Sequence, residues 1–209
     1  MDTQYGHIIL NELDKELEKL GLHFCRYADD RNVYLKSRKS AFRVMASISR
    51  FIEEDLKLKV NKDKSKVDRL WKLKYLGFTF YRKKGEMGIR AHPNSVKKLK
   101  DKLKEITGRS NAMSMEFRVI KLRQVIVGWV NYFKLADMKC TLKTLDEWLR
   151  RRIRICYWKQ WKRIKTKHDN LKRLGIDEYK AWEYANTRKG YWRISNSPIL
   201  AITLTEKYL

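Results

Sequence analysis

The sequence is poor in cysteine and has no long apolar run. Three cysteines occur among 209 residues, Cys25, Cys140 and Cys156, and no two of them form a CxxC pair. The four histidines are scattered, so neither a zinc site nor a disulfide framework is expected. We expect each cysteine to be a small buried hydrophobic residue.

Neither a membrane span nor a secretory signal is visible. The longest apolar run, 125–133, is interrupted by Gly128 and Asn131. It is far shorter than the roughly 20 residues that a membrane-spanning helix needs. No basic segment precedes an apolar stretch at the N-terminus. We therefore expect a cytoplasmic chain that contacts no membrane.

Acidic residues are scarce relative to basic ones. The chain has 49 Lys and Arg against 24 Asp and Glu, which gives a formal net charge of +25. Such a surplus opposes compaction unless a polyanion neutralises it, so nucleic acid is the first partner to expect. With 43% hydrophobic residues, the chain can still form one compact core or two small ones, and intrinsic disorder is not expected.

The first part of the chain mixes helical and β-type patterns. Helical spacing is predicted over 8–20, with Gly21 as the stop, and over 40–57. A hairpin is predicted over 24–36, turning at Asp29 and Asp30. Further strands are predicted at 58–60, 66–68 and 74–80, the last joined to 88–90 in a second hairpin.

Beyond His92 the pattern becomes helical. The predicted helices are 96–106, 114–135, 141–167 and 177–185, with Ser95, Ser114, Thr141 and Asp177 as caps. Residues 1–92 carry 21 basic and 13 acidic groups, whereas 93–209 carry 28 and 11. We therefore predict the α+β class, with one mixed domain over 1–92 and one helical domain over 93–209.

Two adjacent carboxylates lie at the turn of the first predicted hairpin. A tight turn would hold Asp29 and Asp30 together at the end of a sheet, which is costly unless cations neutralise them. Divalent ions that prefer carboxylate oxygen are the natural neutraliser. The alternative is a solvated turn in which both residues serve turn propensity.

The residues around this turn resemble the active-site hairpin of reverse transcriptases. The match comprises YADD at 27–30, LKLKVN at 56–61, KSKV at 64–67 and KYLGF at 74–78. Further on, the segments similar to a maturase-specific domain are GWVNYF at 128–133, EWLRRRIR at 147–154, WKQWK at 158–162 and RKGYWR at 188–193. From about Ile8 to its C-terminus, the chain thus resembles group II intron reverse transcriptases, also called maturases.

The resemblance implies a truncated reverse-transcriptase palm over 1–92 and a helical thumb over 93–209. It implies Mg²⁺ as cofactor, with Asp29 and Asp30 as catalytic metal ligands. It also implies Lys64 as a proton donor near the departing pyrophosphate. The implied primer grip is Leu76, Gly77 and Phe78. The alternatives are that Lys64 is an ordinary surface lysine and that Gly77 serves only a strand bend.

Two features depart from the family pattern. Arg31 and Asn32 stand where many relatives carry apolar residues. No segment resembles the family's fingers or the strand that carries its further metal-binding Asp. We therefore expect the metal site to be incomplete in this chain unless an upstream fingers and palm fragment joins it.

Cationic residues fill the middle of the predicted helical domain. Eleven Lys or Arg and two acids lie between Lys139 and Lys167, and contacts to phosphates are their simplest use. The predicted nucleic-acid-binding residues are Arg150, Arg151, Arg152, Arg154, Lys159, Lys162 and Arg163. Trp148 and Trp161 could stack on bases, but their helical spacing favours a place in the core.

The resemblance implies RNA-directed DNA synthesis and assistance to intron splicing, with intron RNA and an RNA/DNA primer-template as partners. The alternative is a non-catalytic maturase remnant that only binds RNA. The family's further metal-binding Asp, which no segment here resembles, separates the two functions. An unrelated basic DNA-binding module would explain the charge but neither the acidic hairpin nor the order of the motifs. No Cys/His cluster resembles the family's homing endonuclease, so DNA cleavage is not expected.

Overall fold

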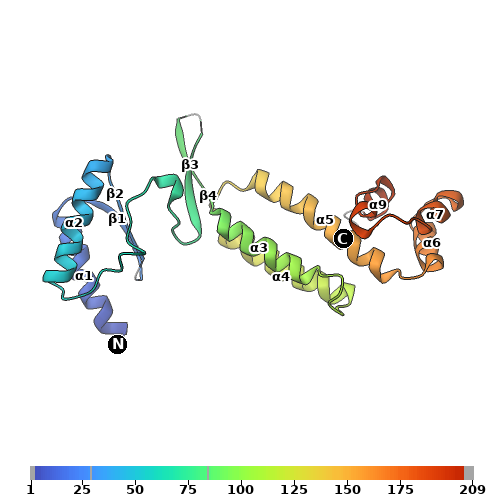
Figure 1. Ribbon diagram of the computed structural model, residues 1–209, viewed down its shortest axis with the longest axis horizontal. Helices are drawn as coiled ribbons and strands as arrows, with labels where there is room; N and C mark the ends of the chain where they lie inside the picture. The colour runs from blue at the N-terminus through green and yellow to red at the C-terminus, as the bar shows by residue number, and fades with distance from the viewer. Residues whose placement is uncertain (1–2, 29, 84, 205–209) are drawn as a thin grey trace. The chain divides into compact units, whose positions relative to one another are not determined.

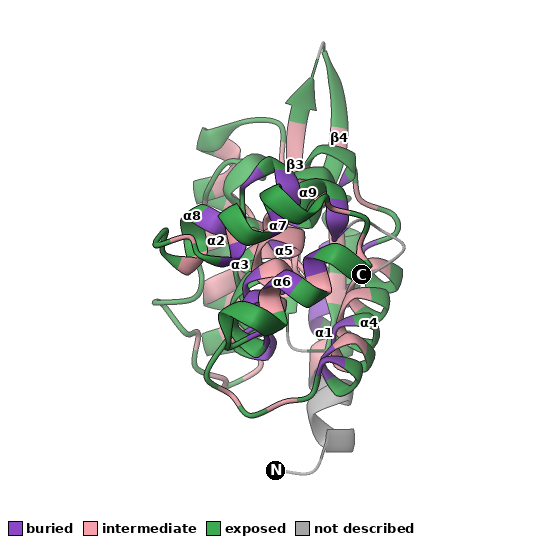
Figure 2. Ribbon diagram, turned by 90° about the vertical axis from the view of Figure 1, so that its right-hand side faces the viewer, coloured by how far each residue is buried: buried purple, intermediate pink, exposed green. Residues whose placement is uncertain are grey.

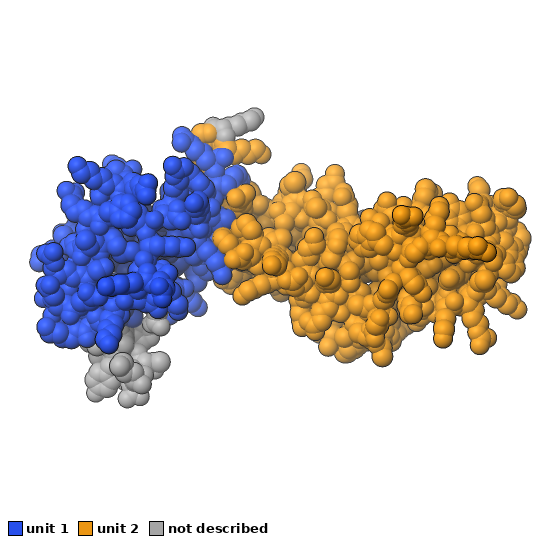
Figure 3. Space-filling view, in the orientation of Figure 1, with its two compact units in different colours: residues 1–82 blue, residues 83–209 orange. Residues whose placement is uncertain are grey.

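The computed structural model describes residues 3–28, 30–83 and 85–204, and of residues 3–9 only the backbone. The chain forms two compact units, 1–82 and 83–209 (Figure 3). The first combines helices with short strands and the second is mainly helical (Figure 1), which confirms the α+β class. No helix in the described part of the chain is both long and apolar enough to span a membrane.

The first helix ends where the sequence predicts. Helix α1 (Thr3–Lys19) stops at Gly21, whose φ is +62°. The amide of Leu22 donates to the carbonyl of Leu17 at 3.0 Å, which is the hydrogen bond of a Schellman-type helix end. Leu17 is fully buried, so the apolar stripe of α1 faces the interior of the unit.

The predicted first hairpin is confirmed. Strands β1 (His23–Tyr27) and β2 (Asp30–Tyr34) are antiparallel, with Tyr27 opposite Asp30. Asp30 is therefore the first residue of β2, not a residue of the turn as predicted. Helix α2 (Arg38–Glu54) follows, and the Ser37 side chain caps it by accepting the Ser40 amide at 3.1 Å.

Two of the predicted strands are wrong. Residues 58–60 and 66–68 have no regular structure, because no strand among the described residues pairs with them. The strand predicted over 74–80 begins only at Phe78, after the short helix η1 (Leu70–Lys72). Strands β3 (Phe78–Lys83) and β4 (Glu86–Ala91) form a second two-stranded sheet, and the described residues nearest its turn are exposed (Figure 2).

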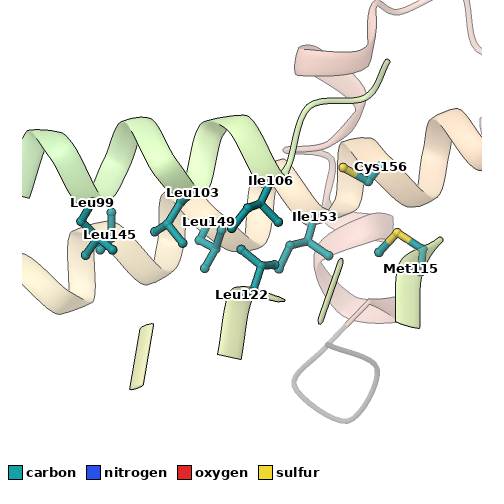
Figure 4. Close-up of a cluster of buried hydrophobic side chains, with 9 residues drawn as sticks. All are labelled: Leu99, Leu103, Ile106, Met115, Leu122, Leu145, Leu149, Ile153 and Cys156. Carbon is teal, nitrogen blue, oxygen red and sulfur yellow. The ribbon is translucent and has the colours of Figure 1, made fainter. Parts of the chain in front are cut away.

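Three helices form the first core of the second unit. They are α3 (Pro93–Ile106), α4 (Met115–Tyr132) and α5 (Lys139–Gln160). The side chains buried among them (Figure 4) are Leu99, Leu103, Ile106, Met115, Leu122, Leu145, Leu149, Ile153 and Cys156. The prediction of buried cysteines holds for Cys156 and is wrong for Cys25 and Cys140, which are exposed.

Half of the predicted helix caps are confirmed. Ser114 caps α4, and Asp177 caps α7 (Glu178–Ala185). The N-cap of α3 is His92 instead of Ser95, because Pro93 suits the first helical position. The N-cap of α5 is Met138 instead of Thr141.

The helix predicted over 141–167 is broken. Helix α5 ends at Gln160, and α6 (Ile164–Arg173) starts after residues 161–163. Helices α8 (Tyr191–Ile194) and α9 (Pro198–Thr203) complete the unit. The second core consists of Trp158, Trp161, Leu171, Ala181, Ile194, Ile199, Leu200 and Leu204. Trp161 is thus a core residue, as predicted, whereas Ile164, three residues further on, is 46% exposed.

The C-terminal end of α3 is held by an arginine of α4. Arg118 is 4% exposed, and its guanidinium donates to the carbonyls of Ile106, Gly108 and Met113. It also donates to Asn111 Oδ1 at 2.8 Å. The last carbonyls of a helix have no partners within that helix, so Arg118 supplies donors where the backbone lacks them.

Two residues of α5 bind the same helix end. Arg152 donates to Thr107 Oγ1 at 2.6 Å and to the Thr107 carbonyl at 3.1 Å. The Cys156 thiol donates to that carbonyl at 3.4 Å, and burial raises the pKa of the thiol, which keeps it a protonated donor. We call Thr107, Arg118, Arg152 and Cys156 the α3 clasp. It joins all three helices of the first core.

The clasp can be tested on Arg118. Arg118→Met would remove the charged donor from the carbonyls of Ile106 and Gly108 and from Asn111 Oδ1, and a hydrogen bond to a charged group contributes about 1.5 to 3 kcal/mol. We expect the free energy of unfolding of the second unit to fall by at least about 2 kcal/mol. Urea unfolding followed by tryptophan fluorescence measures this, because six of the seven tryptophans lie in that unit.

Arg123→Met is the matched control, since Arg123 is exposed on the same helix. Its effect should stay within about 0.5 kcal/mol. Equal stabilities of the two variants would contradict the clasp.

Candidate functional site

A carboxylate of α1 holds the hairpin that carries Asp30. Asp14 is 9% exposed, forms an ion pair with Arg26 Nε at 2.6 Å and accepts a hydrogen bond from Arg31 at 2.7 Å. Arg26 and Arg31 lie opposite each other on β1 and β2, so both strands bind one carboxylate. Arg31 also donates to the carbonyl of Leu10 at 2.9 Å. We call Asp14, Arg26 and Arg31 the hairpin clamp.

The clamp explains why an arginine follows the acidic pair. Burial lowers the pKa of Arg31, and the neighbouring Asp14 carboxylate opposes that shift by favouring the charged guanidinium. The partner was visible in the sequence: Asp14 lies on the same helical face as Leu10, Leu13 and Leu17. An acid within an apolar stripe indicates a buried partner, but the stripe does not say which cation.

The second face of the hairpin carries Cys25, Asp30 and Tyr34. Burial raises the pKa of Tyr34 to about 12, helped by the neighbouring Cys25 and Tyr75. Burial also raises the pKa of Tyr75, with smaller contributions from Cys25 and from the negative charge of Asp30. The ring of Tyr34 meets that of Phe80 edge to face, with 6.2 Å between centroids. The segment around the predicted primer grip thus packs beside Asp30.

The predicted metal ligands are only partly described. Asp30 is exposed, while Asp29 lies outside the described residues. In the parts of the chain that the structure describes, no three His, Cys, Asp or Glu side chains converge as a metal site. A carboxylate oxygen is the donor type that Mg²⁺ prefers. The exposed Asp30 carboxylate is therefore a candidate ligand.

The predicted primer grip is a tight turn. Tyr75 and Phe78 exchange backbone hydrogen bonds of 3.0 and 2.8 Å. Between them, Leu76 and Gly77 have φ of +49° and +81°, as in a type I′ turn. Gly77 therefore does serve a backbone bend. The fully buried hydroxyl of Thr79 donates to the carbonyl of Trp71 at 3.2 Å, which anchors the turn to η1.

Lys64 lies in a separate exposed turn. Its amide donates to the carbonyl of Asn61 at 3.2 Å and to Asn61 Oδ1 at 3.1 Å. The described contacts do not join the Lys64 side chain to Asp30. Its role as a proton donor stays a prediction.

Three of the four predicted nucleic-acid-binding arginines of α5 form hydrogen bonds within the fold. Arg151 donates to the carbonyl of Trp192 at 2.7 Å, and Arg152 belongs to the α3 clasp. Arg150 Nε donates to Asp146 on the same helix at 2.7 Å. Arg154 is half-buried, and burial lowers its pKa. Their charge is therefore at least partly used in packing.

Trp148 is also part of this packing. It is half-buried against the first core, as favoured by its helical spacing. Lys100 and Arg152 lie over its ring, 5.0 and 5.4 Å from the ring centroid.

A second group of cations is exposed. Lys159, Lys162 and Arg163 lie at the end of α5 and in the break before α6, and Lys165 follows in the first turn of α6. In the described part of the chain, their side chains form no ion pair. No Asp or Glu occurs between Glu147 and Asp169. We call Lys159, Lys162, Arg163 and Lys165 the basic segment.

Two family models match the chain. The model for reverse transcriptase (RNA-dependent DNA polymerase) matches residues 5–80, and the model for the group II intron maturase-specific domain matches residues 96–175. The chain belongs to the group II intron reverse transcriptases and maturases. Intron-encoded reverse transcriptase and maturase function follows from these two domains. A search of the curated proteins finds no match.

The two matches divide the described features between them. The hairpin clamp, Lys64 and the predicted primer grip lie in the reverse-transcriptase match. The α3 clasp and the basic segment lie in the maturase-specific match. The reverse-transcriptase family also suggests dependence on a divalent metal, and the two domains suggest intron RNA and other nucleic acids as partners.

The hairpin clamp can be tested by removing the charge of Asp14. Asp14→Asn removes the ion pair with Arg26 and weakens the hydrogen bond from Arg31, and a hydrogen bond to a charged group contributes about 1.5 to 3 kcal/mol. We expect the amides of residues 23–34 to exchange with deuterium roughly 10- to 100-fold faster than in the wild type. Hydrogen exchange followed by mass spectrometry measures this.

Glu12→Gln serves as the control. Glu12 is exposed on the same helix and pairs only with Lys15 in the described structure. Unchanged exchange of the hairpin in Asp14→Asn, or equal acceleration in both variants, would show that the clamp does not hold the hairpin.

Proposed function

We propose that this chain binds intron RNA through the basic segment. The observation that carries the proposal is a group of exposed cations, without ionic partners among the described residues, inside the maturase-specific match. Each phosphate that such a cation neutralises releases counterions, which makes binding favourable and salt-dependent. A formal net charge of +25 adds long-range attraction to a polyanion.

The arginines of α5 contribute less to this binding in our proposal. Arg151 and Arg152 donate to backbone carbonyls within the fold, and turning to a phosphate would break those hydrogen bonds. The exposed side chains of the basic segment lose no such bond when they meet a phosphate. We therefore place the main phosphate contacts at 159–165.

We further propose that residues 1–92 form part of a polymerase palm and residues 93–209 the thumb. In this proposal Asp29 and Asp30 would hold Mg²⁺ ions, which supply charge neutralisation for the attacking and departing oxygens. Lys64 would donate a proton, and the turn at 76–78 would support the primer. The remaining metal ligand would come from an upstream palm segment outside these residues. The free cysteines fit the reducing cytoplasm as the site of action.

The second candidate function is an RNA-binding maturase without polymerase activity. It is favoured by the exposed basic segment inside the maturase-specific match, whose phosphate contacts need no metal site. Primer extension on an RNA template separates the two candidates. Extension that is lost in Asp30→Asn, with or without an added upstream fragment, supports the polymerase, whereas no extension under either condition supports the remnant.

The binding proposal is tested by removing the four charges of the basic segment. Changing Lys159, Lys162, Arg163 and Lys165 to Gln should weaken binding to a structured intron RNA. The slope of log affinity against log salt concentration should also become shallower, by roughly 0.7 to 0.9 for each lost phosphate contact. Filter binding over a range of salt concentrations measures both.

The matched control removes four exposed charges elsewhere in the same unit, at Arg123, Lys134, Lys139 and Lys143. Because both variants lose the same net charge, only local contacts distinguish them. An equal change of slope in the two variants would place the RNA-binding surface outside the basic segment.

A further inference from the structure

Trp192 is a large aromatic residue held at the protein surface. It lies in the short helix α8 and is 45% exposed. Ile194 and Ser195, two and three residues further on, are fully buried, so the backbone beneath the ring is anchored in the second core. An exposed tryptophan on a fixed backbone is a rigid surface that needs little ordering when a ligand arrives.

One face of the Trp192 ring is covered by Arg151. The guanidinium carbon of Arg151 lies 3.8 Å from the ring centroid. The same guanidinium donates to the Trp192 carbonyl at 2.7 Å, and the Ser195 hydroxyl donates to that carbonyl at 2.9 Å. These bonds fix the guanidinium and the ring relative to each other. The exposed part of the ring can accept a second planar group, and the cation beneath would strengthen attraction to an anionic ligand.

The surroundings of Trp192 are cationic. Its neighbour Tyr191 has Arg109 over its ring at 4.7 Å and Lys159 at 5.8 Å. Lys159 is a member of the basic segment, so the two features adjoin. Arg188, Lys189 and Arg193 are exposed in the same stretch of chain.

Trp182 provides an internal comparison. It is 42% exposed, almost as much as Trp192. Its ring, however, is stacked on His168 with centroids 4.1 Å apart, and its Nε1 donates to Glu178 at 2.9 Å. Asp169 also lies beside His168. The two tryptophans are thus almost equally exposed, but carboxylates lie near Trp182 and cations lie near Trp192.

We propose that Trp192 is a stacking platform for an unpaired nucleobase of the RNA that the basic segment binds. The inference rests on the proposed RNA binding, because Lys159 joins the two sites. Aromatic side chains stack on bases that are splayed out of a helix, whereas bases in a duplex are already stacked on their neighbours. Trp192 therefore adds affinity for single-stranded RNA and little for a duplex.

The test compares two RNA probes of the same sequence, a short unstructured single strand and its perfect duplex. Loss of one base–aromatic stack lowers affinity by roughly 5- to 100-fold. We expect this loss for Trp192→Leu with the single strand and less than about a twofold change with the duplex. Trp192→Phe should retain most of the affinity, since it keeps a π face. Trp182→Leu should bind both probes as the wild type does.

A second measurement follows RNA binding by the protein with Trp192 intact. In the chain labelled with 5-fluorotryptophan, the ¹⁹F resonance missing from Trp192→Phe identifies Trp192. Adding the single strand should shift that resonance, and adding the duplex should not. This keeps the inference testable if Trp192→Leu fails to fold.

The outcomes separate this inference from the proposed function. If the wild type binds neither probe, the proposed RNA binding fails and the stacking inference fails with it. If the basic-segment variant loses affinity for both probes while Trp192→Leu binds like the wild type, only the stacking inference is overturned. Equal losses for single strand and duplex in Trp192→Leu, or an unmoved Trp192 resonance, also overturn it.

Discussion

The helix packing of the second unit depends on the side chains that donate hydrogen bonds to the carbonyls at the C-terminal end of α3. Helix ends leave such carbonyls without partners, and burial makes each missing donor costly. Arg118 of α4 and Arg152 of α5 supply the donors together. Because each guanidinium reaches more than one acceptor, the two arginines fix the positions of α4 and α5 on α3. Apolar packing alone would specify these positions less strictly.

Adjacent arginines of α5 extend this constraint to the rest of the unit. Arg152 binds the end of α3, whereas Arg151 binds the backbone and the ring of Trp192 in α8. Helix α5 thus connects both cores, and the basic segment begins in its last turn. The first unit uses the opposite arrangement, in which the single carboxylate of Asp14 holds arginines from two strands. In both units, some arginines hold the backbone in place, and other cations stay exposed to a ligand.

Local signals in the sequence predicted the elements that depend on neighbouring residues. Gly21, Ser114 and Asp177 mark real helix ends, and the run from β1 to β2 forms the expected hairpin. The failures are non-local. Residues 58–60 alternate like a strand but have no partner strand, and the helix over 141–167 breaks so that Trp161 can pack with Leu171 in the second core. The roles of Arg118 and Arg151 depend on residues far along the chain, so charge patterning could not separate them from surface cations.

The central claim is that the exposed lysines of the basic segment contact RNA while the arginines of α5 maintain the fold. Amine acylation followed by mass spectrometry tests this most directly, because it reports every lysine at once in the unaltered protein. With a saturating structured intron RNA, the account predicts strong protection of Lys159, Lys162 and Lys165, and unchanged reactivity of Lys134 and Lys139. If Lys159, Lys162 and Lys165 react as fast with RNA as without it, the account is contradicted.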